Sequence, residues 1–409
     1  MKLHLNGPSN NTLKAAIKIT GSKSESNRSL LLSALYPNIS IANLSNSDDA
    51  QFMERGLTVE KGTVDIHHAG TAMRFLTSYF ACQSNREVVL TGSHRMQERP
   101  IKVLVDALKS LGADITYEKE EGYPPLKIKG VAINKEKVSL PANISSQYIS
   151  SLLLIAPSLK NGLEVELVGQ ITSIPYIKMT LGLLDEIGVK HSFEGNTIKI
   201  SPKNDVSETL LTVESDWSSA SYFYSIVAFS EIGSEVSLSA YKKNSLQGDS
   251  VLAEIYTALG VETSFEKNNI TLKKIAKEYP EILEVDLVNA PDIAQTIAVT
   301  CFGLGIGCNL AGLHTLKIKE TDRLEALDVE LKKLGADIEV TDKSLSLHAT
   351  SSIKPDIAID TYHDHRMAMA FAPLAFRTSI IINDAEVVSK SYPDFWDDMK
   401  ILGIKVVEL

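Results

Sequence analysis

Several short segments place cations next to carboxylates and hydroxyls, a combination that suits the binding of phosphate or carboxylate groups. The first is GSKSESNR at 21–28, where a lysine, an arginine and three serines stand at the expected start of a helix. A helix N-terminus offers unpaired N–H groups and a partial positive charge, and both favour a bound anion. Further segments of this kind are AGTAMR at 69–74, RMQERP at 95–100, KETDR at 319–323 and DHR at 364–366.

Each segment also has a plain structural explanation. The residues that could cap helices are Ser24, Thr71, Ser145, Asp292 and Asp364. Glu320 and Arg323 are spaced for an i,i+3 ion pair, and Pro100 suits a first helical turn. Segment 21–28 is not a P-loop, because Ser22 separates the glycine from the lysine. Taken alone, this segment favours a helix cap with solvated charges.

Taken together, the segments favour an anion site. If the helices are equivalent, seven cations stand at matching ends of them: Lys23, Arg28, Arg99, Lys319, Arg323, Arg366 and Lys390. So many like charges on one surface would repel one another, and we expect anionic ligands to balance them.

The helices that must carry these segments recur along the chain. Apolar stretches begin near Thr71, Ser145, Trp217, Asp292 and Asp364, at intervals of 74, 72, 75 and 72 residues, and an earlier one follows Lys23. A second, amphipathic series ends in glycine, at Gly112, Gly188, Gly260, Gly335 and Gly403, with a degenerate member at Gly56. This spacing predicts a repeated strand–helix–strand–helix–strand–strand unit, with the apolar helices inside and the amphipathic ones outside. Three glycine-ended helices on each side predict a domain boundary near 213–215.

The composition narrows the class of protein. A net charge of −10 over 409 residues argues against broad nucleic-acid binding, which needs a basic face. The chain start lacks the apolar run of a signal peptide. The uncharged stretch 293–316 holds several glycines, so we expect a buried helix over 293–302, a turn and a strand rather than a membrane span. Three cysteines without metal-ligand spacing, Cys82, Cys301 and Cys308, indicate a reducing, cytoplasmic setting.

The order and spacing of these segments resemble the 5-enolpyruvylshikimate-3-phosphate synthase family along essentially the whole chain. The resemblance implies an α/β fold, a two-domain inside-out α/β barrel in which each domain holds three βαβαββ units. It places the first domain at 18–213 and the second at 1–17 with 214–409, with the active site in the interdomain cleft. No metal and no organic cofactor is implied.

The implied reaction transfers the enolpyruvyl group of phosphoenolpyruvate to the 5-hydroxyl of shikimate 3-phosphate and releases phosphate, through a tetrahedral intermediate. The residues implied for shikimate 3-phosphate are Lys23, Ser24, Arg28, Ser145, Ser146, Ser173, Tyr176, Asp292 and Lys319. Those implied for phosphoenolpyruvate are Lys23, Gly70, Arg99, Gln147, Arg323, Arg366 and Lys390. For catalysis the resemblance implies Asp292 as base, Glu320 as proton shuttle at carbon and Lys23 as an acid near the leaving phosphate.

Three positions depart from the family pattern. His68 stands where asparagine is frequent, Phe75 where proline or leucine is common, and Thr315 where asparagine is usual. We expect the first two to reshape the phosphoenolpyruvate pocket and the third to alter one shikimate contact.

Three other functions fit the sequence less well. A sister transferase acting on UDP-N-acetylglucosamine typically carries a loop cysteine near its Arg-Pro segment, and 91–108 holds none. A non-catalytic anion-binding protein would be favoured by loss of Asp292, Glu320 or Lys23, and all three are present. A metal hydrolase could be argued from His363 and His365, but further ligand spacing is missing. We therefore expect small-molecule substrates, no nucleic acid or membrane partner, and a monomer, because the repeats already close two domains.

Overall fold

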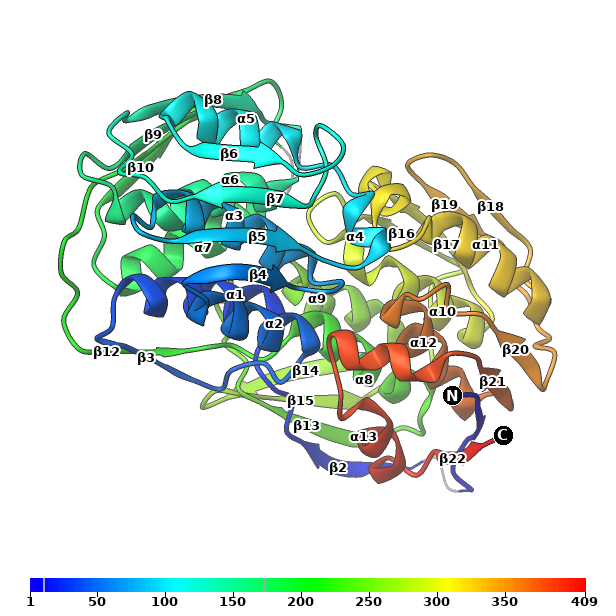
Figure 1. Ribbon diagram of the computed structural model, residues 1–409. Coiled ribbons are helices and arrows are strands. Elements are labelled where there is room, and N and C mark those ends of the chain that lie inside the picture. The colour runs from blue at the N-terminus through cyan, green and yellow to red at the C-terminus, as the bar shows by residue number, and fades with distance from the viewer. Residues whose placement is uncertain (10–11, 144, 172–173) are drawn as a thin grey trace. The chain divides into compact units, whose positions relative to one another are not determined.

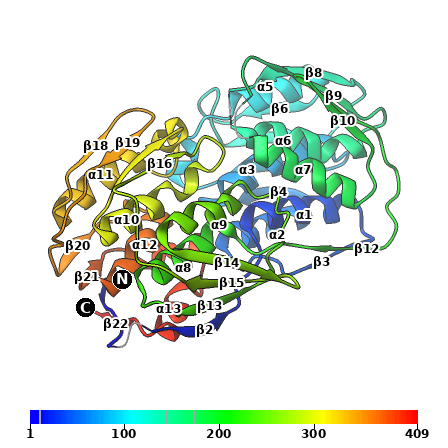
Figure 2. The same ribbon diagram turned by 180° about the vertical axis from the view of Figure 1, so that it is seen from behind.

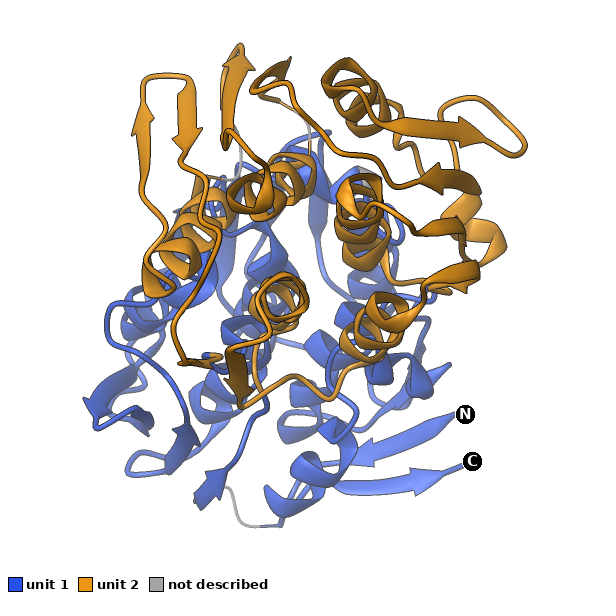
Figure 3. Cartoon of the chain, turned by 60° about the vertical axis from the view of Figure 1, so that its left-hand side comes forward, with its two compact units in different colours: residues 1–20, 214–409 blue, residues 21–213 orange. Residues whose placement is uncertain are grey.

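The computed structural model describes residues 1–9, 12–143, 145–171 and 174–409. The chain divides into two compact units (Figure 3). Unit 1 comprises Met1–Thr20 and Glu214–Leu409, and unit 2 comprises Gly21–Val213. The resemblance implied that the chain passes from the second domain into the first after residue 17, and in the structure it passes from unit 1 into unit 2 after residue 20. Each unit has its own hydrophobic core.

Unit 2 contains two complete βαβαββ repeats (Figure 1). The elements of the first are β4 (Lys61–Asp65), α3 (Gly70–Cys82), β5 (Glu87–Thr91), α4 (His94–Gln97), α5 (Lys102–Leu111), β6 (Asp114–Tyr117) and β7 (Leu126–Lys129). Those of the second are β8 (Lys137–Pro141), α6 (Ser146–Ile155), η1 (Ala156–Ser158), β9 (Leu163–Val168), α7 (Ile174–Glu186), β10 (His191–Glu194) and β11 (Thr197–Ile200). In both, the first two strands pair in parallel, and the closing hairpin adds antiparallel to the second strand, in the orders β4-β5-β7-β6 and β10-β11-β9-β8.

The opening repeat of unit 2 is shorter than the expected βαβαββ pattern. Its elements are α1 (Lys23–Leu35), β3 (Ile39–Ala42), α2 (Asp48–Thr58) and β12 (Thr209–Thr212). β3 and β12 pair in parallel as a two-stranded sheet. The hairpin is missing from this part of the described chain, because α2 ends at Thr58 and the next repeat begins with β4 at Lys61.

The described residues of unit 1 form three four-stranded sheets. The first repeat holds β2 (Lys14–Ile17), α8 (Trp217–Phe229), β13 (Glu235–Ser239), η2 (Gly248–Val251), α9 (Leu252–Ile255), η3 (Tyr256–Leu259), β14 (Val261–Glu266) and β15 (Asn269–Lys274). The second holds β16 (Ile282–Asp286), η4 (Pro291–Ile293), α10 (Ala294–Leu304), β17 (Gly307–Ala311), η5 (His314–Ile318), α11 (Arg323–Leu334), β18 (Ile338–Val340) and β19 (Leu345–Leu347). The third holds β20 (Ile357–Ile359), α12 (His365–Phe371), η6 (Ala372–Phe376), β21 (Ile380–Ile382), η7 (Ala385–Lys390), α13 (Phe395–Ile401), β22 (Lys405–Glu408) and β1 (Leu3–Asn6).

The N-terminal strands complete two of these sheets. β2 pairs in parallel with β13, in the order β14-β15-β13-β2, as the view from behind shows (Figure 2). β1 inserts between β21 and β22 and pairs antiparallel with both. The two chain ends therefore lie side by side in unit 1 (Figure 1).

The apolar helices form the interior of each unit, as the sequence predicts. Every residue of α8 except Ser218 is buried, and α3 is buried from Gly70 to Ala81. The uncharged stretch forms the buried helix α10, a left-handed turn at Gly305 and strand β17. Glycine ends the amphipathic helices in the predicted way, with φ of 106° at Gly112 and 105° at Gly335. Gly56 differs, because it lies inside α2.

Among the described residues, no helix has the length and apolar character needed to cross a lipid bilayer.

Candidate active site

In unit 1, six of the predicted residues meet in one network, which we call the Asp292 cluster. Its members are Asp292, Lys319, Glu320, Arg323, Arg366 and Lys390, joined by Asp364. They come from four segments of two repeats: η4, residues 319–323 at the start of α11, residues 364–366 at the start of α12, and the end of η7. These predicted residues of unit 1 therefore lie together in the structure.

Arg323 is the centre of this cluster. Its side chain is 2% exposed, and its guanidinium contacts three carboxylates. Nη1 lies 2.9 Å from Asp292 Oδ1, Nη2 lies 2.9 Å from Glu320 Oε2, and Nε lies 2.7 Å from Asp364 Oδ2. The predicted i,i+3 pair of Glu320 and Arg323 thus exists, inside a larger network.

Asp292 receives three cations. Besides Arg323, Lys319 Nζ lies 3.3 Å from its Oδ1 and Arg366 Nη2 lies 3.4 Å from its Oδ2. Burial alone would raise the pKa of Asp292, but Lys319, Arg366 and Arg323 outweigh burial and hold this pKa well below its usual range. Asp292 is therefore ionised at neutral pH in this arrangement.

Glu320 joins the remaining cation to the cluster. Its Oε1 accepts a hydrogen bond from Lys390 Nζ at 3.0 Å, while its Oε2 accepts from Arg323. The expectation of mutually repelling cations is wrong for unit 1, because Asp292, Glu320 and Asp364 neutralise most of the charge of the four cations. An anionic ligand would compete with these carboxylates rather than fill an unbalanced cationic surface.

Helix caps position the cluster. Asp322 caps α11 by accepting from the N–H groups of Leu324 and Glu325, which fixes Arg323 as the first helical residue. Asp364 caps α12 by accepting from Arg366 N at 2.9 Å, as predicted, and also binds Arg323. Asp292 is not a cap, because it lies inside η4.

The turn before α12 is strained. Tyr362 and His363 both have positive φ, 54° and 55°, an unfavourable region for residues with a side chain. Tyr362 Oη donates to Glu330 Oε1 at 2.6 Å, and this buried glutamate also accepts from Lys333 Nζ at 2.9 Å. These bonds hold the turn that delivers Asp364 to Arg323.

In unit 2, the predicted residues that the structure describes, other than Arg99, lie at or near the starts of α1, α3, α6 and α7, and these helices pack against one another. Arg28 of α1 is buried, at 1% exposure. It donates to Thr180 Oγ1 at 2.8 Å, Ser150 Oγ at 2.9 Å and the Ser24 main-chain oxygen at 2.7 Å. Its guanidinium also lies over the rings of Phe75 and Tyr176.

These contacts make Arg28 a structural link between helices in this structure. Its hydrogen-bond partners among the described residues are neutral oxygens, and burial lowers its pKa to about 10. The role implied for Arg28, contact with shikimate 3-phosphate, is not tested by this geometry and stays a prediction.

Lys23 starts α1 and approaches a carboxylate that sequence reasoning missed. Its Nζ lies 3.8 Å from Oδ1 of Asp49, which is 2% exposed. The predicted Ser24 cap is wrong, because the helix begins at Lys23 and Ser22 occupies the cap position without a side-chain hydrogen bond. Asp49 is the second residue of α2, two positions after the cap Ser47, so in the sequence it looks like an ordinary first-turn carboxylate.

Gly70 and Arg99 lie in direct contact. A Cβ added to Gly70 would come within 2.6 Å of Arg99 Nη1. Arg74, which carried no predicted role, donates to the main-chain oxygens of Gly70 at 3.0 Å and Pro100 at 3.4 Å and thereby links both neighbours. Pro100 itself precedes α5, which begins at Lys102.

Gln147 and the serines before it form the third group. Ser145 caps α6 as predicted, by accepting from Gln147 N, and Ser146 is buried. Gln147 Nε2 donates to Thr71 Oγ1 at 3.1 Å, so Thr71 is a partner of Gln147 rather than the cap of α3, which Ala69 precedes. Tyr176 stands in the first turn of α7, and Ser173 lies outside the described residues.

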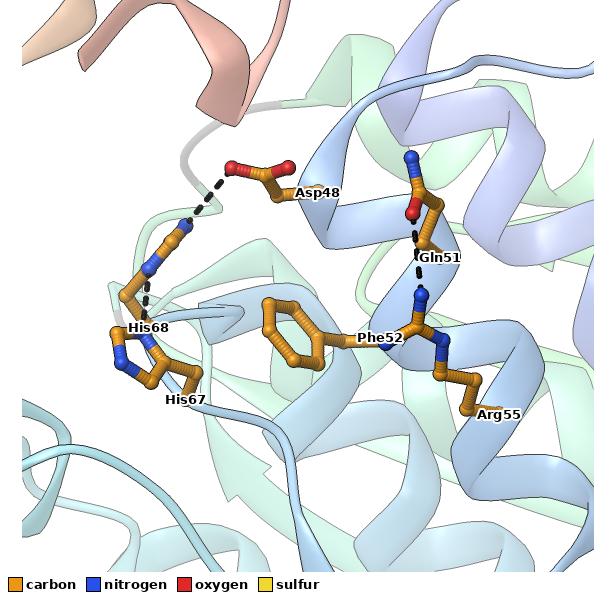
Figure 4. A pocket seen from close by; sticks show the side chains of 6 residues that line it. All are labelled: Asp48, Gln51, Phe52, Arg55, His67 and His68. Atoms are coloured by element: carbon orange, nitrogen blue, oxygen red, sulfur yellow. Dashed lines mark hydrogen bonds and ion pairs between the residues drawn. The ribbon is translucent and has the colours of Figure 1, made fainter. Parts of the chain in front are cut away.

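His68, which departs from the family pattern, lines a cavity of about 350 Å³ in unit 2 (Figure 4). The lining residues are Asp48, Gln51, Phe52, Arg55, His67 and His68. His68 Nε2 lies 3.8 Å from Asp48 Oδ2, and the two histidine Nδ1 atoms are 2.8 Å apart. The His68 side chain is thus directed toward the start of α2. Phe75 is fully buried beneath Arg28.

Over residues 1–9, 12–143, 145–171 and 174–409, no three His, Cys, Asp or Glu side chains are grouped to hold a metal ion. His365 is 2% exposed at the start of α12, whereas His363 is exposed.

Comparison with known proteins shows to which family the chain belongs. Residues 53–399 match the EPSP synthase family (3-phosphoshikimate 1-carboxyvinyltransferase). A protein of Bacteroides fragilis named 3-phosphoshikimate 1-carboxyvinyltransferase is 45% identical over 415 residues, covering 100% of both chains. One of the same name from Photobacterium damsela subsp. piscicida is 36% identical over 423 residues, covering 96% of this chain and 98% of the relative.

A solved EPSP synthase structure from Acinetobacter baumannii shares the fold. It aligns with a TM-score of 0.81 over 100% of both chains, at 22% sequence identity.

Proposed function

The chain belongs to the EPSP synthase family, and on that premise we propose which of its residues carry the family's reaction. The enzyme is a 3-phosphoshikimate 1-carboxyvinyltransferase, which transfers the enolpyruvyl group of phosphoenolpyruvate to the 5-hydroxyl of shikimate 3-phosphate and releases phosphate. The observation that carries the assignment of residues is the Asp292 cluster, where two carboxylates suited to proton transfer share four cations suited to phosphate and carboxylate.

The cations divide between the two substrates. Arg323, Arg366 and Lys390 of unit 1, with Lys23, Gly70, Arg99 and Gln147 of unit 2, bind phosphoenolpyruvate. Asp292 and Lys319, with Lys23, Ser24, Arg28, Ser145, Ser146, Ser173 and Tyr176, bind shikimate 3-phosphate. Guanidinium groups suit carboxylate and phosphate because their paired N–H donors match two oxygens at once.

Asp292 acts as the base for the 5-hydroxyl. In the structure its pKa is held low by Lys319, Arg366 and Arg323, and a carboxylate so stabilised is a weak base. When substrate anions draw these cations toward themselves, their hold on Asp292 weakens and its pKa rises. Substrate binding therefore prepares the base.

Glu320 moves the proton at carbon. It is ion-paired to Arg323 and Lys390, two cations assigned to phosphoenolpyruvate, so its carboxyl is next to the groups that hold this substrate. Protonation of the methylene carbon and attack of the 5-oxygen give the tetrahedral intermediate. Loss of a proton from the same carbon and departure of phosphate, aided by Lys23 as acid, restore the enol ether.

The reaction is tested by phosphate release. We expect turnover with shikimate 3-phosphate plus phosphoenolpyruvate and none with UDP-N-acetylglucosamine plus phosphoenolpyruvate. Turnover with the second pair alone would overturn the assignment.

Lys23→Met tests the least connected of the catalytic assignments. We expect kcat to fall about 10²-fold or more, the usual effect of removing a positioned acid. Lys61→Met removes an exposed lysine from the same unit and serves as the matched control. Full activity in Lys23→Met would remove Lys23 from the mechanism.

The enzyme acts as a monomer in the cytoplasm. Three free cysteines support a reducing compartment, and each unit closes its own core. Light scattering of the purified chain and fractionation of the source cell test these two statements.

A further inference from the structure

One side of Arg366 is held by a hydroxyl that belongs to neither set of substrate-binding residues. Arg366 Nη2 donates to Ser218 Oγ at 3.1 Å, and Ser218 is the second residue of α8. Ser218 Oγ in turn donates to Oδ2 of Asp249, a carboxylate of η2 that is 6% exposed. A chain of hydrogen bonds therefore runs from a buried carboxylate through a hydroxyl to the guanidinium.

The direction of these bonds suits the arginine. A serine hydroxyl has one proton, and Ser218 commits it to Asp249, so its lone pairs remain for a donor. A guanidinium can only donate, and hydrogen bonds in a chain strengthen one another. Burial, and next the charge of Asp292, raise the pKa of Asp249 to about 6, so this carboxylate is still mostly ionised at neutral pH.

The other partner of Arg366 is Asp292, whose carboxylate would compete with an anionic substrate for the guanidinium. Arg366 Nη1 donates to the main-chain oxygen of Asp292 at 3.1 Å, and Nη2 lies 3.4 Å from its carboxylate. Without Ser218, the hydrogen bonds that remain to the guanidinium among the described residues are those to Asp292. The guanidinium would then be free to turn fully toward the Asp292 carboxylate.

We propose that Ser218 and Asp249 are positioning residues that hold the Arg366 guanidinium in the orientation that receives the anionic end of phosphoenolpyruvate. The inference rests on the proposed role of Arg366. Both residues act through Arg366, so losing either weakens binding of the anion equally in the ground state and the transition state. Such a loss raises KM and leaves kcat nearly unchanged.

Steady-state kinetics give the first test. Ser218→Ala is expected to raise KM for phosphoenolpyruvate about tenfold, the effect of losing one hydrogen bond to a charged group. We expect Asp249→Asn to change KM in the same direction. The matched control is Ser225→Ala, seven residues further along α8, which removes a buried hydroxyl bonded to Thr300 and should leave KM unchanged.

A double-mutant cycle on unfolding gives a test that needs no substrate. Ser218→Ala and Arg366→Lys should be non-additive, by at least about twofold in the unfolding equilibrium constant, because the two side chains are in contact. Absence of turnover in the wild-type chain would remove the proposed function, while this cycle still decides whether Ser218 holds Arg366. Additivity in the cycle, or an unchanged KM in Ser218→Ala with turnover intact, would overturn the inference.

Discussion

Gly70→Ala should weaken the binding of phosphoenolpyruvate without destabilising the protein. Gly70 is the first residue of α3, and the new Cβ would lie 2.6 Å from Nη1, 3.2 Å from Cζ and 3.3 Å from Nη2 of Arg99. Ordinary van der Waals contact begins near 3.4 Å. Arg99 must therefore retreat from its present place by about 0.8 Å.

The size of the effect follows from that displacement. A charge-assisted N–H···O bond of roughly 2.8 Å would lengthen to about 3.6 Å, beyond hydrogen-bonding distance. Losing one hydrogen bond to a charged group costs roughly 1.5–3 kcal/mol, which corresponds to an increase of about ten- to hundredfold in KM. Alanine in place of glycine in a helix should leave stability unchanged or raise it by up to about 1 kcal/mol.

The assay is phosphate release against phosphoenolpyruvate concentration at saturating shikimate 3-phosphate, with thermal unfolding followed in parallel. The sharpest control is the same substitution in an Arg99→Ala background, where the new methyl group has no guanidinium to displace. There Gly70→Ala should have no further effect on KM.

Two results would refute the reasoning. An unchanged KM in Gly70→Ala would show that Arg99 swings aside without loss of its ligand. An equal increase of KM in the Arg99→Ala background would show that the methyl group acts by another route.

Three further substitutions test other parts of the structure. Glu320→Gln should lower kcat by about 10²–10⁴-fold in the phosphate-release assay, because an amide cannot carry the proton; activity close to wild type would exclude the shuttle role. Arg28→Lys should lower the free energy of unfolding by about 2–4 kcal/mol in a denaturant titration, because a lysine cannot keep the bonds to Thr180 and Ser150; Arg95→Lys, at an exposed arginine, should change it by less than about 1 kcal/mol. Burial lowers the pKa of Lys274 to about 8 from 10.5, so the unfolded chain binds more protons between these values and stability rises with pH across that window. Lys274→Met should remove this rise, worth up to about 3 kcal/mol at 1.36 kcal/mol per pH unit; an unchanged pH dependence of unfolding would exclude Lys274 as its source.

Local features of the site could be predicted from sequence, because their partners are close along the chain. The Ser145 and Asp364 caps and the Glu320–Arg323 pair each join residues two or three positions apart. The glycine-ended helices and the uncharged helix before Gly305 were likewise evident from spacing.

Features that depend on distant segments could not be predicted in this way. The Ser150 and Thr180 hydroxyls that hold Arg28 are 122 and 152 residues away. Counting cations alone predicted repulsion, but the carboxylates that neutralise Arg323 come from η4, the residues before α11 and the cap of α12. Asp249 had no signal at all, because a single aspartate in the short helix η2 gives no indication that a serine of α8 will bind it.

The strand β1 has a consequence for the order in which the chain can fold. Unit 2 is one continuous segment, so all its strands and helices have left the ribosome once residue 213 has been followed by enough chain to clear the exit. Unit 1 must instead join Leu3 to Ile382 and Glu408, partners at opposite ends of the chain. Contacts of such sequence separation form late, because closing the long intervening loop costs entropy first.

During synthesis, β1 and β2 therefore remain unpaired until their partner strands have been made. The whole of unit 2 is synthesised in the meantime. A chain truncated before β22 would leave β1 with an open edge, which is a template for association with other chains. Unit 1 is thus the part of this enzyme most exposed to incomplete synthesis and to removal of its last few residues.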